Sequence, residues 1–320
     1  MRLTALLLVA AALVACTQQV QPEAVQVAPP APAATTDKLL EDVRILSADD
    51  MEGRLVGSPG AAKARAYILG RLAEIGIAPA IGNSLEHRFN FQREDGAVEG
   101  VNLIGIVPGT GGSDRALVLM AHYDHVGVQN GQVYNGADDN ASGVATVLKI
   151  AASLKQVAPK HDIIIALVDA EEGGLRGARA MVADPAFKPF LDRTVIAVNL
   201  DMVSRNDRNE LYVAGAYHFP WLKPRLDAIA ATAVVTLKQG HDRPELKQDD
   251  WTMQSDHGAF HAVKKPWVYF GVEDHPGYHN PGDDFGAIPA DFFQRSAATI
   301  ESAIRAFDAD LAAIAEEAGR

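Results

Sequence analysis

The sequence has 320 residues, of which 48% are hydrophobic, and a formal net charge of −12. That length is enough for one large domain or two small ones. The acidic balance argues against a nucleic-acid-binding protein, because the chain has no basic stripe that would neutralise phosphates.

The N-terminal segment predicts export. A single basic residue, Arg2, precedes an apolar run in MRLTALLLVAAALVAC that is too short to span and remain in a bilayer. This is the pattern of a signal peptide over 1–15. The LVAC at its end resembles the lipobox of bacterial lipoproteins, which implies that Cys16 becomes the lipid-carrying N-terminus. An ordinary secretory signal with an incidental cysteine is the alternative.

The segment after the signal peptide, the cysteine count and the remaining apolar stretches indicate how the chain would meet a membrane. Residues 16–36 are rich in Pro, Ala, Gln and Val without periodicity, which predicts a flexible tether between the anchor and a domain over 37–320. Cys16 is the only cysteine, so neither an intrachain disulfide nor a cysteine metal site is possible. No later apolar stretch is long enough to cross a membrane, so we expect membrane contact only through lipid on Cys16, in the bacterial envelope, facing the periplasm or at the cell surface.

Helical and strand patterns alternate along the rest of the chain. In chain order we expect helices at 37–47 and 60–76, strands at 101–109 and 116–124, a helix at 142–156, a strand at 162–172, a helix at 174–183, a strand at 194–202, a helix at 220–233, a strand at 266–274 and a helix at 290–319. The strands are short and several are apolar on both faces, as buried parallel strands are. The fold class is therefore α/β, a three-layer sandwich around a mostly parallel mixed sheet.

Acidic and histidine side chains follow these strands. His122 and Asp124 come directly after one apolar run, Glu171 and Glu172 after the next, and Asp201 after a third. Two more groups lie at Asp138, Asp139 and Asn140, just before a helix, and at Tyr278 and His279, a few residues after the last strand. In a parallel sheet these points converge on the edge at the carboxyl ends of the strands, where such folds bind ligands.

A cluster of carboxylates without a cation would repel itself and bind protons. A divalent metal ion resolves this conflict. Imidazole and carboxylate ligands without a thiolate suit zinc in a hydrolytic site.

The motifs MEGRLVGSPG, HYDH, GADDNASG, EEGGLRGA, NLDM, SDHGAF and GYHNPGDD occur in an order that resembles the M28 co-catalytic zinc peptidases. That class includes bacterial secreted aminopeptidases, and the resemblance covers about 37–315. It implies the zinc-peptidase (phosphorylase/hydrolase-like) fold, two zinc ions per chain and a peptide substrate. The sequence indicates no oligomeric state.

The resemblance also implies a role for each residue. His122 would bind one zinc, Asp139 would bridge both, Glu172 and Asp201 would each complete one zinc, and His279 would bind the other. Asp139 is chosen over its neighbour because the bridging aspartate of the family lies three residues before a serine, here Ser142. The peptide bond after it is cis in relatives.

Further roles are implied around these ligands. Glu171 would be the general base for a water held between the metals, and Tyr278 would donate a hydrogen bond to the oxyanion. Asp124 would accept a hydrogen bond from His122. Asp256 is either a similar acceptor or a turn residue. His125 is expected behind the ligands or in solvent; His257 and His261, four residues apart, are rival ligands.

Aminopeptidase activity is the favoured function. The alternatives are a carboxypeptidase or dipeptidase, a glutaminyl cyclase with one zinc on the same fold, and a binding protein that has lost its metals. The segment 81–100 is too short for the inserted lid domain of some relatives. We therefore expect loops 203–218 and 238–254 to help form the substrate site.

Overall fold

The computed structural model describes residues 37–94 and 96–319. The described residues belong to one compact unit that spans 36–320. The predicted signal peptide over 1–15, the lipidation at Cys16 and the tether over 16–36 lie outside the described residues. In the described part of the chain, no helix combines the length and the apolar character that crossing a membrane requires.

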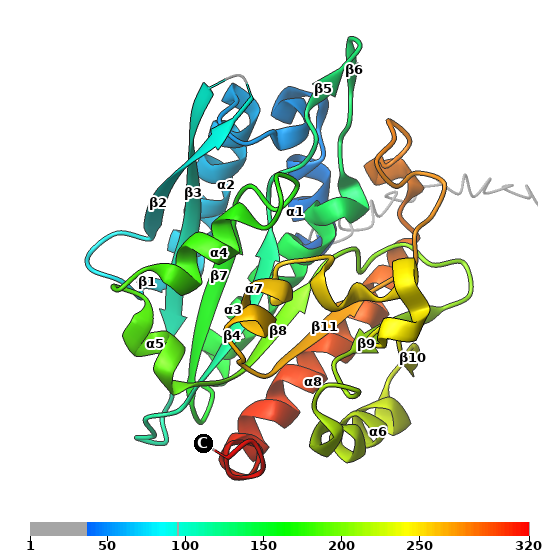
Figure 1. Cartoon of the computed structure of the whole chain (residues 1–320). Coiled ribbons are helices and arrows are strands. Elements are labelled where there is room, and N and C mark those ends of the chain that lie inside the picture. The colour runs from blue at the N-terminus through cyan, green and yellow to red at the C-terminus, as the bar shows by residue number, and fades with distance from the viewer. Residues whose placement is uncertain (1–36, 95, 320) are drawn as a thin grey trace, which may run out of the picture. The chain divides into compact units, whose positions relative to one another are not determined.

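A twisted nine-stranded mixed sheet forms the centre of the fold (Figure 1). Its strands, in spatial order, are β1 Ala78–Pro79, β3 Gly96–Val107, β7 Asp162–Val168, β4 Ala116–His122, β8 Thr194–Leu200, β11 Trp267–Gly271, β9 Glu210–Ala214 and β10 Thr236–Gln239, with β2 Glu86–Arg93 also paired to β3. The middle of the sheet, β7-β4-β8-β11, is entirely parallel. The predicted mixed sheet is therefore confirmed, and its parallel part is the part that carries the site.

The flanks of the sheet are antiparallel. β3 runs antiparallel to β7 and forms a hairpin with β2, while β9 runs antiparallel to β11. The sequence prediction contained β3 but neither β2 nor β9. The predicted strands are continuous apolar runs, and β2 lacks such a run. Its sequence EHRFNFQR alternates polar and apolar residues, and most of its polar side chains face solvent. A small two-stranded arm, β5 Val128–Gln129 and β6 Gln132–Val133, projects beside the sheet.

Helices cover both faces of the sheet, as expected for a three-layer sandwich (Figure 1). One face carries α1 Lys38–Leu46, α2 Pro59–Ile75, α3 Gly143–Gln156, α6 Lys223–Thr232 and α8 Ala290–Glu317. The other face carries α4 Arg176–Ala183, α5 Lys188–Arg193 and α7 His257–Ala262. Short 3-10 segments connect these elements: η1 Asp49–Arg54, η3 Pro220–Leu222, η4 Pro244–Asp249, η5 Trp251–Met253 and η6 Phe285–Ala287.

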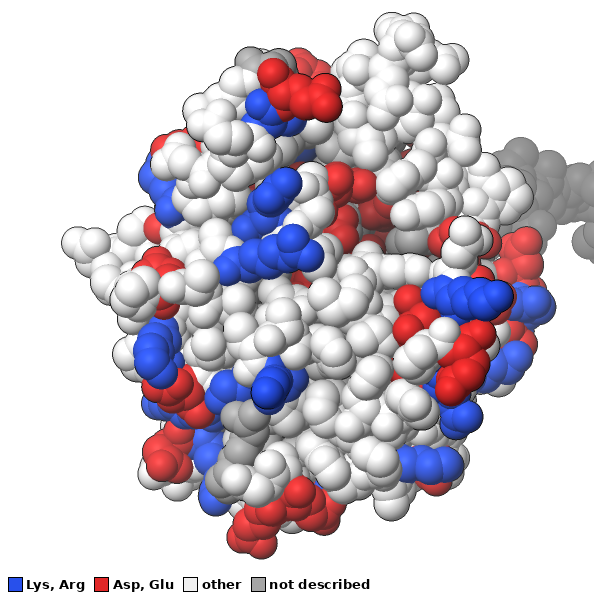
Figure 2. Space-filling view, in the orientation of Figure 1, with Lys and Arg blue, Asp and Glu red and all other residues white. Residues whose placement is uncertain are grey.

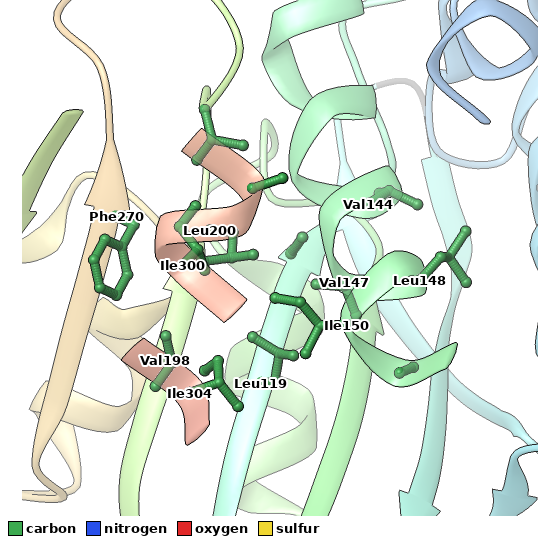
Figure 3. Close-up of a cluster of buried hydrophobic side chains, with 14 of the residues drawn as sticks. Leu119, Val144, Val147, Leu148, Ile150, Val198, Leu200, Phe270, Ile300 and Ile304 are labelled. Carbon is green, nitrogen blue, oxygen red and sulfur yellow. The ribbon is translucent and has the colours of Figure 1, made fainter. Parts of the chain in front are cut away.

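The two faces of strand β4 show how the layers are held together. Leu119 points into the core shared with α3 and α8, whereas Val118 and Met120 point into the core shared with α4 and α7. Figure 3 shows Leu119 among side chains such as Ile150 of α3 and Ile304 of α8. Every residue of β4 is buried. Each large apolar side chain buried in this way contributes about 1.5–3 kcal/mol, so the ends of this strand are fixed in space.

The two segments expected to be loops are partly regular. Segment 203–218 contains β9, and segment 238–254 contains the last residues of β10 followed by η4 and η5. β10 pairs in parallel with residues 210–213 of β9. The two strands extend the sheet beyond β11.

Candidate metal centre

Three neighbouring parallel strands deliver acidic and imidazole groups to one edge of the sheet. His122 is the last residue of β4 and pairs with Val168, the last residue of β7. Asp201 directly follows β8, which lies on the other side of β4. Because all three strands point the same way, their carboxyl ends coincide.

The chain turns sharply as soon as it leaves these strands. Ala170, just before Glu171, has φ +59°, and Met202, just after Asp201, has φ +56°. His279 itself has φ +48°. Such left-handed conformations are rare for residues other than glycine, and they cluster at functional sites because the surrounding structure must hold them in place.

One group of ligand atoms consists of His122, Asp139 and Asp201. Nε2 of His122 lies 3.2 Å from Oδ1 of Asp201 and 3.4 Å from Oδ1 of Asp139. All three residues are buried. They can hold one metal ion between them.

A second group consists of Asp139, Glu172, His279 and His125. Nε2 of His279 lies 3.1 Å from Oδ2 of Asp139 and 3.1 Å from Oε2 of Glu172. Asp139 therefore belongs to both groups, with Oδ1 facing His122 and Oδ2 facing His279. A carboxylate in this position would be shared by two metal ions if both groups were occupied.

The separations between these atoms fit zinc. Zinc–nitrogen and zinc–oxygen bonds of about 2.0–2.1 Å at a tetrahedral angle place neighbouring ligand atoms about 3.3 Å apart. The four contacts just described span 3.1–3.4 Å. The donor set contains imidazole and carboxylate only, which is the set that zinc accepts in hydrolytic sites.

The turn that carries Asp139 is held by a second carboxylate. η2, Ala137–Ser142, contains a cis peptide bond between Asp139 and Asn140, as the resemblance implies. Oδ2 of Asp283 accepts hydrogen bonds from the backbone N–H groups of Asp138 at 3.1 Å and Asp139 at 3.0 Å. The loop that bears His279 and the turn that bears Asp139 are thereby tied together.

Asp124 connects the ends of two strands. Its carboxylate accepts the backbone N–H of Glu171 at 2.9 Å and that of Glu172 at 3.3 Å. Nδ1 of His122 lies 3.5 Å from Oδ1 of Asp124 and 3.2 Å from its backbone carbonyl oxygen. Asp124 thus lies where it can orient both the imidazole and the Glu171–Glu172 pair, and its predicted supporting role remains a prediction.

Burial and mutual repulsion disturb the pKa values of the acids at this edge. Burial raises the pKa of Glu171 well above its usual range, although the neighbouring His122 opposes the shift. Burial likewise raises the pKa of Asp139 and brings that of Asp256 to about 8. Without cations, this edge of the sheet therefore holds protons at neutral pH.

The histidines and Glu172 shift in the direction that balances these acids. The pKa of His279 rises to about 10, since hydrogen bonds and charge from Asp139 and Glu172 outweigh burial. The pKa of His122 rises for the same reason, with Asp201 and Glu171 as the main charges. Hydrogen bonds from His125 and His279 outweigh burial at Glu172 and hold its pKa well below its usual range. The protonated histidines thus balance the negative charge of the carboxylates. Metal ions can take the place of these protons.

A buried arginine supports the same site. The guanidinium of Arg54 is fully buried and donates to the backbone carbonyl groups of Tyr123 at 2.8 Å, Asn135 at 2.6 Å and Gly136 at 2.8 Å. It also donates to the carbonyls of Leu46 and, at 3.4 Å, Asp139. Burial lowers the pKa of Arg54 to about 10 against the pull of nearby acids, first among them Asp139. Arg54 therefore joins the HYDH segment to the Asp139 turn and places a positive charge behind the ligands.

Two predicted residues lie at the edge of the cluster. Tyr278 is half-buried and its ring stacks on His279, with centroids 4.0 Å apart. Asp256 is fully buried, and neither of its carboxylate oxygens has a hydrogen-bond partner among the described residues. Its pKa responds to the charges of His122 and Asp124, so it lies within electrostatic reach of the first group.

Figure 2 shows where this edge reaches the surface. Acidic side chains line a hollow that lies above α4 on the face covered by α4 and α7. Glu171 and Glu172, which precede α4 by a few residues, are partly exposed. A substrate can approach the cluster from this side.

One member of the second group was not among the predicted ligands. His125 was expected behind the ligands or in solvent, and Nδ1 of His125 lies 2.8 Å from Oε1 of Glu172. The signal was its place at the fourth position of HYDH, three residues after His122. The rival ligands His257 and His261 lie on α7, outside both groups. Burial lowers the pKa of His257 to about 3, and its Nε2 contacts the backbone carbonyl of Trp251 at 2.8 Å.

The fold and the site define an α/β protein with two adjoining groups of potential metal ligands at the carboxyl ends of its parallel strands. The chain belongs to peptidase family M28, whose sequence profile matches residues 102–304. This membership confirms the predicted family.

Comparisons with single proteins agree with the family. Aminopeptidase YwaD of Bacillus subtilis is 31% identical over 197 residues, which are 58% of this chain and 40% of that protein. The chain thus spans less than half the length of this relative. A zinc aminopeptidase from Bacillus subtilis has the same fold, with a TM-score of 0.67 at 17% identity over 85% of this chain and 94% of the other. A glutaminyl cyclase from Porphyromonas gingivalis shares the fold equally, with a TM-score of 0.67 at 18% identity over 84% of this chain and 96% of the other.

Proposed function

We propose that this protein is a zinc-dependent exopeptidase with two metal ions per chain, and that it acts as an aminopeptidase. The observation that carries the proposal is the position of Asp139. Its two carboxylate oxygens face two different ligand groups, one with His122 and one with His279. Two adjacent cation sites that share one carboxylate suit a co-catalytic hydrolase.

When bound, the two ions lower the pKa of water toward neutrality and polarise the carbonyl of the substrate. Five residues would hold them: His122 and Asp201 in one site, Glu172 and His279 in the other, and Asp139 in both. A carboxylate of raised pKa suits a group that must take up a proton and release it again. Glu171 is such a group.

The remaining steps fall to side chains around the ligands. The carboxylate of Glu171 takes the proton of the attacking water and returns it to the leaving amine. The hydroxyl of Tyr278 donates a hydrogen bond to the oxygen of the cleaved carbonyl as that oxygen gains charge. Asp124 keeps the backbone of Glu171 in place by accepting its N–H.

The aminopeptidase hypothesis rests on the named relatives as well as on the site. YwaD of Bacillus subtilis is an aminopeptidase by name, and so is the zinc enzyme that shares the fold. Glutaminyl cyclase is the second function, since several such enzymes share the fold equally well. Two complete ligand groups favour the peptidase, because a glutaminyl cyclase on this fold would require only one zinc ion.

Metal content and substrate preference test the proposal together. Purified protein is assayed for zinc and then for hydrolysis of aminoacyl-arylamides, N-blocked peptides and peptides with an N-terminal glutamine, with and without a chelator. About two zinc ions per chain with chelator-sensitive cleavage of free-N-terminus substrates is the expected result. Cyclisation of glutaminyl peptides with one zinc would favour the cyclase, and a protein without zinc and without activity would refute both.

We further propose that the protein is exported and anchored by lipid on Cys16, on the strength of the LVAC pattern after the apolar run. The test is metabolic labelling with radioactive palmitate in a bacterial host. Wild-type protein should carry label in the membrane fraction, and Cys16→Ser should carry none. Unlabelled wild-type protein in the soluble periplasmic fraction would refute the anchor.

A further inference from the structure

His125 is a buried imidazole beside the second ligand group. Its side chain is 0% exposed. Nδ1 lies 2.8 Å from Oε1 of Glu172 and 3.7 Å from Oδ2 of Asp139. Nε2 has no hydrogen-bond partner among the described residues. Among the described residues, the hydrogen bond of the His125 ring is therefore the one that Nδ1 makes with Glu172.

The contact distance favours one of two possible roles for His125. Ligand atoms that share one zinc lie about 3.3 Å apart, and the four contacts among the five predicted ligands are 3.1–3.4 Å long. The contact between His125 and Glu172 is 2.8 Å, which is a charge-assisted hydrogen-bond length. His125 thus contacts Glu172 as a donor.

The two oxygens of Glu172 have different neighbours. Oε1 contacts Nδ1 of His125, whereas Oε2 contacts Nε2 of His279 at 3.1 Å. A carboxylate with one oxygen occupied by a hydrogen bond presents the other oxygen to a metal. Its orientation is then set before the metal arrives.

The surroundings hold the His125 ring in place. A Cβ on Gly136 would lie only 2.6 Å from Cγ and Cδ2 of His125, so the absence of a side chain at Gly136 makes room for the ring. Gly136 also has φ +56°, which favours glycine. The backbone N–H of His125 donates to the carbonyl of Arg54 at 3.4 Å, and its ring meets the ring of His279 edge-on, with centroids 5.6 Å apart.

We propose that His125 is a positioning residue of the second metal site: its Nδ1–H holds Oε1 of Glu172 and leaves Oε2 for the metal beside His279 and Asp139. This inference rests on the proposed two-metal function. Partners that orient a ligand typically contribute 10–100-fold to metal affinity. The prediction therefore concerns the affinity of one of the two zinc sites.

Three substitutions separate the hydrogen bond from simple packing. His125→Asn places an amide N–H close to the position of Nδ1 and keeps the donor. His125→Gln places its amide near the position of Nε2 and loses the contact, and His125→Leu removes every donor. His161→Leu is the matched control, because His161 is another buried histidine that contacts an aspartate, Asp308, at the opposite edge of the sheet.

The readout is stepwise zinc affinity, measured by competition with a chromophoric chelator on folded protein, with far-UV circular dichroism as the check of folding. His125→Gln and His125→Leu should weaken one zinc site by about 10–100-fold. His125→Asn and His161→Leu should retain two sites near wild-type affinity. If His125→Leu fails to fold, the Asn and Gln variants decide.

Two results overturn the inference and leave the proposed function intact. One is unchanged affinity at both sites in His125→Gln and His125→Leu. The other is a crystal structure of the zinc-loaded protein in which Nδ1 of His125 lies about 2.0–2.1 Å from zinc, because His125 would then be a ligand. A wild-type protein that binds no zinc refutes the proposed function itself.

Discussion

Nε2 of His122 and Oδ1 of Asp201 lie 3.2 Å apart although 79 residues separate them along the chain. The cause is the pairing of β4 with β8 in parallel, with Met120 beside Asn199. The two strands are buried on both faces, so their carboxyl ends are rigid. This half of the metal centre is therefore built into the core of the protein.

Removal of Asp201 should empty only the site that it shares with His122. We expect Asp201→Ala to bind about one zinc per chain and to lose peptidase activity, since Glu172, His279 and Asp139 still form the other group. Atomic absorption on dialysed protein measures the zinc. Asp114→Ala, at an exposed position just before the amino end of β4 and thus at the end of the strand opposite His122, is the control and should keep two. Full double occupancy in Asp201→Ala would contradict the ligand assignment.

Removal of the shared carboxylate should affect both sites. Asp139 is the only described residue that belongs to both ligand groups. Asp139→Ala should therefore lose zinc from both sites and lose activity at the same time. Isothermal titration of metal-free protein with zinc measures this. Two intact binding steps in the variant would show that another residue is the bridge.

Removal of the Glu171 carboxylate should lower activity without lowering zinc content. It belongs to neither ligand group, so Glu171→Gln should keep its zinc. A missing general base typically costs about 10²–10⁴-fold in rate. We expect kcat to fall by that amount while zinc content and KM stay close to wild type. Near-normal kcat in the zinc-loaded variant would remove Glu171 from its proposed role.

Much of the arrangement of the metal ligands could be predicted from the sequence, because the ends of buried strands can be located in it. Buried parallel strands appear as short apolar runs, and the polar residue that follows each run must lie at the edge of the sheet. The strand ends brought His122, Glu171, Glu172 and Asp201 together in this way, and the family resemblance supplied which of them would bind metal. The choice of Asp139 over Asp138 came from the family pattern instead, since both aspartates lie in the same turn.

The parts that were missed depend on contacts between distant segments. Nothing local marks Arg54, in the MEGR segment, as a buried group that donates to carbonyls as far away as Asp139. Nothing local marks Asp283 as the acceptor of the backbone N–H groups of Asp138 and Asp139. His125 could not be separated from a solvated histidine before its distance to Glu172 was known. Such tertiary contacts carry no periodic signal.

Arg54 should matter for stability more than for chemistry. Arg54→Met has a similar length but removes the guanidinium donor from five backbone carbonyls. The Gly136 carbonyl still accepts the N–H of Ala141 at 3.2 Å, and each buried acceptor left unsatisfied costs about 1–3 kcal/mol. Arg54→Lys keeps the charge with fewer donors and should lose less. Urea unfolding of zinc-loaded and chelator-treated protein measures both variants. The larger loss should appear in Arg54→Met, and equal stability of all three proteins would contradict the role.

The pKa shifts predict how the metal-free protein responds to pH. Asp256 has a pKa of about 8 in the folded protein, against about 4 for an unfolded aspartate. His279 has a pKa of about 10, against about 6.5 when unfolded. Between pH 6 and 8 the folded protein therefore binds more protons than the unfolded chain, and its stability falls as pH rises. Glu172 has the opposite shift, but its effect is confined to pH values below its ordinary pKa. His257, with a pKa of about 3, also has the opposite shift and reduces the trend near pH 6 without reversing it.

Zinc should reverse this trend, because metal ligands bind in deprotonated form and zinc affinity increases with pH. We expect the difference in Tm between zinc-loaded and chelator-treated protein to be larger at pH 8 than at pH 6, as measured by differential scanning calorimetry. Asp256→Asn removes one of the proton-binding groups, so its chelator-treated form should lose less stability between pH 6 and 8 than wild type. A metal-free protein whose Tm rises over this interval would show that the buried acids at the ends of β4, β7 and β8 are not the groups that hold the protons.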